Sequence, residues 1–205
     1  MIAVSVKKKP GESDEHTPLA LDAGGYFGTK AISERLVREA EGPPERVVVR
    51  PGDVFGPGSV PWVERPLALM RRHTPVLVGG GRGLIAHTWI ENLLDGLVLA
   101  IDHPAAPGGV FTVTDGVQTT TCRDYFARLA RAAGLRPPRV SVPVPVALLT
   151  ARLGARLGVP VPFTASAVTY LARRSTYRID AATRVLGYRP RVGLDAAMAA
   201  LSGAF

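Results

Sequence analysis

The spacing of apolar and polar positions in the first quarter of the chain predicts a β–α–β unit. Residues 2–6 (IAVSV) are a short apolar run and residues 46–50 (RVVVR) hold three valines between two arginines, and each is typical of a buried strand. Residues 7–25 are polar and interrupted by Pro and Gly, which predicts a loop. From 26 to 40 the apolar positions recur at helical spacing, and Gly and Pro at 42–44 end the helix. A strand, a crossover helix and a second strand indicate a parallel sheet.

The rest of the chain predicts helices that alternate with short strands. Thr121 is expected to cap the helix that follows it, and Gly187 is expected to close the last helix. The glycines at 79–83 lack the Gly-x-Gly-x-x-Gly pattern of a phosphate loop, and they predict a flexible hairpin turn between two short strands within 74–90. The remaining strands are expected at 108–116 and 139–143, and the helices at 63–72, 91–102, 122–135, 144–159, 162–174 and 179–187.

The composition is that of a packed globular protein. Of the 205 residues 46% are hydrophobic, enough for a sizeable core, and no apolar run approaches the roughly 20 residues of a membrane span. Most of the basic residues are arginines, scattered between Arg35 and Arg191 and interleaved with acidic residues. Aromatic residues do not alternate with basic ones, as a base-stacking surface requires. We therefore expect no nucleic-acid partner and no membrane span.

The cysteine and histidine content argues against a disulfide or metal framework. The single cysteine, Cys122, excludes an internal disulfide and fits a reducing cytoplasm, and we expect it to be a small residue at a helix start. The four histidines show no ligand spacing, so no metal site is predicted. No apolar block follows the lysines at 7–9, so the N-terminus does not have the pattern of a signal peptide. The expected location is cytoplasmic.

Tyr26 and Lys30 stand four positions apart at the start of the predicted helix, in the stretch GGYFGTKAISERLV. Positions i and i+4 share one helix face, so the phenol and the ammonium meet. A free phenol has a pKa of about 10, and a nearby ammonium favours its ionised form, which gives a usable proton donor or acceptor near neutral pH. Oxidation of an alcohol needs such a group, because hydride leaves carbon while a proton leaves oxygen. Lys30 can also hold a ribose hydroxyl of a nicotinamide nucleotide. Taken alone, the spacing is a weak signal that favours an ordinary surface Tyr–Lys pair, because any amphipathic helix can contain it.

Further blocks follow one another along the chain. ESDEHTPL…GGYFGTKAISERLV is an acidic-Thr-Pro loop followed by a Tyr-x-x-x-Lys helix, and VVVRPGDVFGPG, at 47–58, is close to Arg-Pro-x-x-Val-Tyr-Gly-Pro-Gly with Phe55 in place of Tyr. GGGRGLIAHTWIENLLDGLVLAID comes next, and GGVFTVTDG and YRIDAATRVLGYRPRVGLDAAM complete the series. In this order, over nearly the whole chain, these blocks resemble the extended short-chain dehydrogenase/reductase family, in its NAD-dependent epimerase/dehydratase and 3β-hydroxysteroid dehydrogenase-like branch.

The resemblance implies an α/β fold, a partial Rossmann-type parallel sheet with a mostly helical C-terminal substrate-binding cap. Residues 1–58 are then the remnant of the NAD(P)-binding Rossmann domain, to which 84–115 return, and 59–83 and 116–205 form the cap. The first four strands, with the Gly-rich turn that receives the pyrophosphate of NAD or NADP, are missing from the chain. We expect either a truncated form, inactive by itself, or a protein that has lost cofactor binding.

The resemblance also assigns catalytic roles. Tyr26 is the implied acid/base, and Lys30 is its tuning group and the ribose anchor. Ser5, in the expected first strand, is the implied anchor of the substrate oxygen; the alternative is an ordinary strand residue.

A second set of roles falls on the segment after the strand at 46–50. The backbone at Pro51, Gly52 and Val54 is implied to pass the nicotinamide, the alternative being a loop of stiff turn residues. Asp53 has two interpretations, a substrate contact or a turn cap, and we favour the turn.

A third set falls on the substrate side. Arg82, His87 and Trp89 are implied to approach the substrate. For His87 the alternative is a hydrogen-bonded residue of the hairpin, and for Trp89 it is packing of the hairpin on the helix at 91–102.

The implied function is an NAD(P)-dependent oxidoreductase, epimerase or dehydratase reaction at an alcohol or carbonyl of a small molecule, sterol-like or nucleotide-sugar-like. The low polarity of 142–163 favours an apolar alcohol. The alternative is a non-catalytic binding or regulatory protein that keeps the substrate cap. The resemblance is compatible with a homodimer.

Overall fold

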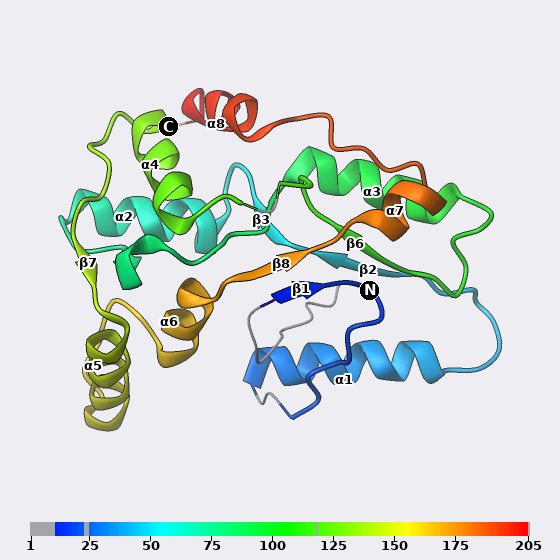
Figure 1. Cartoon of the computed structure of the whole chain (residues 1–205), viewed down its shortest axis with the longest axis horizontal. Coiled ribbons are helices and arrows are strands. Elements are labelled where there is room, and N and C mark those ends of the chain that lie inside the picture. The colour runs from blue at the N-terminus through cyan, green and yellow to red at the C-terminus, as the bar shows by residue number, and fades with distance from the viewer. Residues whose placement is uncertain (1–10, 23–24, 118, 205) are drawn as a thin grey trace. The chain divides into compact units, whose positions relative to one another are not determined.

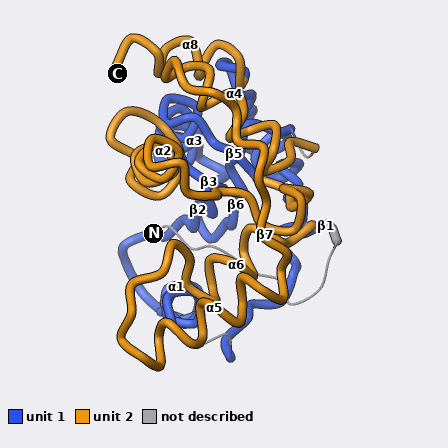
Figure 2. Tube along the Cα trace, turned by 90° about the vertical axis from the view of Figure 1, so that its left-hand side faces the viewer, with its two compact units in different colours: residues 1–54, 86–117, 175–193 blue, residues 55–85, 118–174, 194–205 orange. Residues whose placement is uncertain are grey.

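The computed structural model describes residues 11–22, 25–117 and 119–204, and the chain forms two compact units that interleave along the sequence (Figure 2). Unit 1 takes in 1–54, 86–117 and 175–193, and unit 2 takes in 55–85, 118–174 and 194–205. Residues 175–193 thus lie in unit 1, whereas the sequence-based assignment put them in the cap. The assignment of a Rossmann remnant and a substrate cap stays a prediction.

Unit 1 is an α/β unit with short parallel strand pairs. β2 pairs in parallel with β6, from Val48 opposite Val110 to Pro51 opposite Val113, β1 pairs in parallel with β8, and β3 pairs with β5. Its elements are β1 (Gly11–Ser13), α1 (Gly25–Glu39), β2 (Val48–Pro51), β3 (Asp53–Phe55, at the unit boundary), β5 (His87–Trp89), α3 (Ile90–Asp102), β6 (Val110–Val113), β8 (Ser175–Tyr177) and α7 (Asp180–Val185).

The strands of unit 1 lie between two layers of helices. α1 packs against β2 on one side, and α3 and α7 pack against β2 and β6 on the other (Figure 1). Because helices cover both faces, all four residues of β2 are buried, Arg50 included, and the strand does not alternate between buried and exposed positions. The core between the strands, α3 and α7 consists of Val49, Leu93, Ala100, Ala106, Phe111, Val113, Ala182, Leu186 and Tyr188.

Unit 2 is mostly helical. Its only sheet pairing among the described residues is β4 with β7, in parallel. Rings of Phe55, Trp62, Tyr125 and Tyr170 pack edge-on or tilted at centroid distances of 5.5 to 6.3 Å. The elements are a π-helical turn (Val60–Glu64), α2 (Arg65–Arg71), β4 (Leu77–Val78), a 3₁₀ turn (Gly79–Gly81), α4 (Cys122–Ala132), β7 (Ser141–Val142), α5 (Val144–Leu157), α6 (Ala165–Ala172) and α8 (Leu194–Ser202).

The predicted α/β class is confirmed, with most predicted helices within a few residues of their observed bounds. Thr121 caps α4 as predicted, since its side chain accepts a hydrogen bond from the Asp124 backbone N–H. Cys122 is the buried first residue of that helix. The expected strand at 2–6 lies outside the described residues.

Three predictions about local structure were wrong. The polar stretch 7–25 is not all loop, because β1 lies in it. β4 and β5 do not form a hairpin, because each pairs with a strand outside 74–90. Asp53 does not cap a turn but lies in β3, buried, where its carboxylate accepts the Ala86 N–H at 3.0 Å. β1, β3, β8 and α8 were not predicted; β1 and β8 are short, polar strands without an apolar period.

Candidate active site

The first turns of α1 bring Tyr26 and Lys30 together as predicted. The Lys30 ammonium lies 5.7 Å from the centroid of the Tyr26 ring, a cation–π contact. Tyr26 is 61% exposed, and its ring meets Phe27 edge-on at 5.6 Å. An exposed phenol with an ammonium over its ring is accessible to a small molecule, and it is supported by the rigid backbone of a helix.

A buried ion pair fixes α1 against β2. Glu34, on the inner face of α1, and Arg50, in β2, have side chains that are 0% and 4% exposed. The Arg50 Nη2 and Nε atoms donate to the two Glu34 carboxylate oxygens at 2.6 and 3.0 Å. This bidentate geometry gives strong and directional hydrogen bonds. The Glu34–Arg50 pair fixes the position of α1 along β2 and its rotation about the helix axis.

The same arginine anchors the loop before α1. Arg50 Nη1 donates to the backbone carbonyls of Asp14 and Glu15 at 3.2 and 3.4 Å. Within the loop, the Thr17 hydroxyl donates to the Asp14 carboxylate at 3.0 Å, and this hydrogen bond is the main cause that lowers the pKa of Asp14. The acidic-Thr-Pro stretch is thus a closed local turn tied to the strand through one guanidinium.

These contacts place Tyr26 toward the carboxyl end of β2. α1 leads into β2 through a short connection, so the helix runs back along the strand. Glu34 faces Arg50 near the end of β2, and Tyr26 lies eight residues earlier in the helix, about 12 Å further along the axis at 1.5 Å per residue. Ligands of open parallel α/β sheets bind outside the carboxyl ends of the strands.

Gly52 begins the segment that leaves this end of β2. Its N–H donates to the Val113 carbonyl at 3.1 Å, and the next N–H, of Asp53, donates to the Ala86 carbonyl at 2.6 Å. A Cβ at position 52 would lie 2.1 Å from the Ala86 oxygen, so only glycine fits between β5 and β6. Pro51 ends β2 and Val54 is the central residue of β3, so all three predicted cofactor-contact residues lie in strands or the crossing between them, not in a loop.

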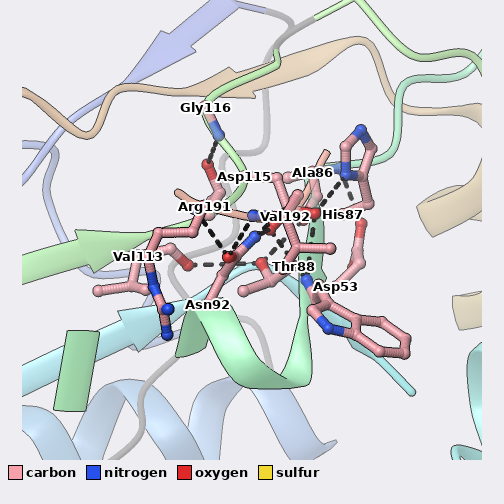
Figure 3. A network of polar contacts seen from close by, with 12 residues as sticks. Asp53, Ala86, His87, Thr88, Asn92, Val113, Asp115, Gly116, Arg191 and Val192 are labelled. Carbon is pink, nitrogen blue, oxygen red and sulfur yellow. Dashed lines mark hydrogen bonds and ion pairs between the residues drawn. The ribbon is translucent and has the colours of Figure 1, made fainter. Parts of the chain in front are cut away.

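Asp115, which follows β6, and Asn92, in α3, lie at the centre of a buried polar network (Figure 3). The Asp115 carboxylate pairs with His87 Nδ1 at 2.7 Å and accepts the Trp89 N–H at 2.9 Å and Asn92 Nδ2 at 2.7 Å. Asn92 also donates to the Val192 carbonyl at 2.8 Å and accepts the backbone N–H groups of Arg191 and Val192 at 3.0 Å each. The Asn92 side chain therefore uses all of its hydrogen-bonding capacity to join α3, Asp115 just after β6, and the C-terminal segment.

Two ionisable groups beside this network have shifted pKa values. Burial, followed by the charges of Asp115 and Asp95, raises the pKa of Tyr188, whose hydroxyl donates to the Thr114 carbonyl at 3.0 Å. A side-chain hydrogen bond from Arg191 lowers the pKa of Asp95. Tyr188 is thus a neutral structural donor.

The remaining predicted site residues lie in different surroundings. His87 and Trp89 are buried, with 1% and 3% exposure, and His87 has the hydrogen-bonded environment foreseen as its alternative. Arg82 belongs to unit 2 and is exposed. The substrate contacts of these three residues stay predictions, and Ser5 lies outside the described residues.

Sequence reasoning missed the residues that support α1. Glu34 and Arg50 were not singled out, because a charged residue on a helix or beside an apolar strand is ordinarily solvated. The available signal was that Arg50 directly continues a wholly apolar strand, where an unpaired charge is costly to bury. Asn92 and Asp115 gave no comparable signal.

No group of three or more His, Cys, Asp or Glu side chains in the described ranges is arranged to hold a metal ion. Among the helices of that part of the chain, none has the length and apolar character needed to cross a membrane.

Comparison with known proteins gives related sequences and folds, although no protein-family model matches. The chain is 34% identical over 196 residues to the 4-hydroxy-2-methyl-3-oxo-4-farnesyl-3,4-dihydroquinoline-1-oxide ketoreductase of Stigmatella aurantiaca, covering 89% of this chain and 58% of the relative. It is 26% identical over 201 residues to the decarboxylating sterol-4-alpha-carboxylate 3-dehydrogenase of Mus musculus, covering 90% and 55%.

Solved structures share the fold. UDP-glucuronic acid 4-epimerase from Bacillus cereus, in complex with NAD, superposes with a TM-score of 0.67 at 20% identity, over 99% of this chain and 58% of that chain. The chain therefore spans little more than half the length of these relatives.

Proposed function

The chain belongs to the extended short-chain dehydrogenase/reductase family, in the branch of epimerases, dehydratases and 3β-hydroxysteroid dehydrogenase-like enzymes, and on this basis we propose that the whole protein is an NAD(P)-dependent oxidoreductase. Its substrate is the secondary alcohol, or the matching ketone, of an apolar small molecule. The observation that carries the proposal is the Tyr26–Lys30 pair, exposed at the start of a helix that Glu34 and Arg50 fix on β2.

Tyr26 is the proposed acid/base. In the oxidation direction the Tyr26 side chain takes the hydroxyl proton of the substrate as the carbon–oxygen double bond forms, and in the reverse direction it returns that proton. The Lys30 ammonium lies 5.7 Å from the centroid of the Tyr26 ring, in cation–π contact with the phenol. When bound, the nicotinamide cofactor supplies the hydride acceptor or donor.

The donors at the start of α1 fit the ribose end of such a cofactor. The Lys30 ammonium has three donors for ribose hydroxyls, and the Tyr26 hydroxyl is exposed beside it. The sequence has no Gly-x-Gly-x-x-Gly turn to receive a pyrophosphate. The proposed roles of these 205 residues therefore concern the reacting end of the cofactor only.

An apolar substrate is favoured over a nucleotide sugar. The two sequence relatives are named for a farnesyl-bearing quinoline oxide and for a sterol carboxylate, whereas the sugar-nucleotide epimerase is a neighbour in fold at 20% identity. The apolar stretch 142–163 in unit 2 supports the same class.

The test is reduction of NAD or NADP by the whole protein with a series of polycyclic and prenylated secondary alcohols. Tyr26→Phe should lower turnover about 10²- to 10⁴-fold, the contribution of a positioned acid/base, with an unchanged far-UV circular dichroism spectrum. Tyr177→Phe, in β8, serves as the matched control and should keep its turnover. Full turnover in Tyr26→Phe would remove Tyr26 from the mechanism, and turnover with nucleotide sugars alone would overturn the substrate class.

A further inference from the structure

α5 buries its small residues and exposes three of its four leucines, while Leu148 packs against the core of unit 2. Ala147, Ala151 and Gly154 form the buried face of the helix, which packs against α6. A Cβ at Gly154 would lie 2.6 Å from a methyl group of Val161, so the contact needs a residue without a side chain. Four larger apolar residues of the helix are exposed on another face.

Those outward residues form a continuous stripe. Val146, Leu149, Leu153 and Leu157 follow one another at intervals of three or four and share one helix face. They are 49%, 58%, 46% and 71% exposed. The eleven helical steps from Val146 to Leu157 give a stripe about 16 Å long at 1.5 Å per residue. Contiguous exposed apolar surface of this kind marks an interaction site.

The charge around the stripe is of one sign. Residues 125–179 contain nine arginines and neither lysine nor any acidic residue, whereas the rest of the chain holds 16 basic and 17 acidic residues. The expected interleaving of basic and acidic residues therefore fails here, and this segment carries the entire positive excess of the protein. Arg152 and Arg156 flank the stripe on α5, both exposed, and within the described part of the chain neither forms an ion pair.

We propose that α5 docks on the surface of an anionic lipid bilayer. Its leucines insert at the boundary between headgroups and acyl chains, and Arg152 and Arg156 extend beside them to lipid phosphates. Interfacial helices combine such an apolar face with basic residues, and arginine stems can lie along apolar surface while their charged ends reach polar groups. A second copy of this chain fits the surface less well, because it would bring two acid-free arginine segments together.

A second exposed apolar face allows a matched control. On α3, Leu94, Val98 and Ile101 are 52%, 56% and 79% exposed. This helix carries three acidic residues and no basic one, so anionic lipid would repel it. Apolar exposure is similar on the two helices, and the sign of the charge differs.

The experiment is flotation of the 205-residue chain with vesicles of phosphatidylcholine alone or mixed with phosphatidylglycerol. The chain should bind the mixed vesicles, and added salt should weaken binding. Leu149→Ser with Leu153→Ser should weaken binding about tenfold or more, and Arg152→Gln with Arg156→Gln roughly 30-fold. Leu94→Ser with Val98→Ser should bind as the unchanged chain does, and circular dichroism checks the fold of every variant.

Several results would overturn the proposal. They are no binding to mixed vesicles, equal binding to both vesicle types, or unaltered binding by the folded arginine variant. Sedimentation velocity without vesicles tests whether the stripe instead joins two copies of the chain. If the chain self-associates and the leucine variant does not, while no vesicle is bound, the stripe is an interface between copies.

Discussion

Removal of the Glu34 charge should loosen α1 from β2 at a large cost in stability. Glu34→Gln keeps the shape of the side chain but leaves the Arg50 guanidinium buried without its counter-charge. Both side chains are almost wholly buried, at 0% and 4% exposure, and the pair is bidentate. Breaking a buried pair by removing one partner costs about 3 to 5 kcal/mol. With a urea dependence of about 2 kcal/mol per molar, the unfolding midpoint should fall by about 1.5 to 2.5 M.

The matched control lies on the same helix. Glu39 forms an exposed pair with Arg35 at 4.0 Å, with side chains 66% and 45% exposed. Glu39→Gln makes the same chemical change at a solvated site and should cost less than about 0.5 kcal/mol. The assay for both is urea unfolding followed by far-UV circular dichroism.

A double variant separates the lost charge from lost packing. Glu34→Gln with Arg50→Met removes both charges and should recover more than half of the loss, since the penalty comes from the uncompensated charge. A midpoint for Glu34→Gln within about 0.5 M of the unchanged chain would refute the reasoning, because the pair would then not compensate a buried arginine.

Three further predictions use the same unfolding assay. Gly52→Ala should cost about 2 kcal/mol or more, since its Cβ would meet the Ala86 oxygen at 2.1 Å, whereas Gly193→Ala, with no atom within 4 Å of its Cβ, should be near neutral. Asn92→Leu should cost about 2 to 4 kcal/mol, because it leaves the buried Asp115 carboxylate and the backbone groups of Arg191 and Val192 without their partner; a loss below about 1 kcal/mol would contradict this. Asp14 and Asp95 have lowered pKa values, so the stability they add is fully present above the ordinary value of 3.8 and is lost as the pH falls through the folded-state pKa. Asp14→Asn should therefore reduce the loss of unfolding free energy on acidification. An unchanged loss in this variant would contradict the role of Asp14.

The sequence predicted elements that have a strong period and missed those that do not. α1, α3 and α4 combine helical spacing with clear ends, and β2 and β6 are mostly apolar. β1 and β8 are polar and three residues long, and they exist because each supplies the other's hydrogen bonds. Pairing of segments more than 150 positions apart leaves no local pattern.

Only the part of the site that lies within one helix was predictable from the sequence. The spacing of Tyr26 and Lys30 is a property of one helix and follows from the sequence. The Glu34–Arg50 pair and the Asn92–Asp115 network join residues 16 and 23 positions apart and depend on how α1 and α3 pack against the strands. The same packing explains Gly52, whose neighbours come from β5 and β6.

Calorimetric titration of the nicotinamide cofactor into the whole protein, beside single-turnover reduction of that cofactor, tests the Tyr26–Lys30 pair most directly. Tyr26→Phe should bind the cofactor nearly as the unchanged protein does and lose turnover, because the phenol proton transfer is missing. Lys30→Met should lose both turnover and affinity, because the ribose hydroxyls lose their ammonium. Unchanged affinity in Lys30→Met together with full turnover in Tyr26→Phe would contradict the assignment of this pair as the reacting centre.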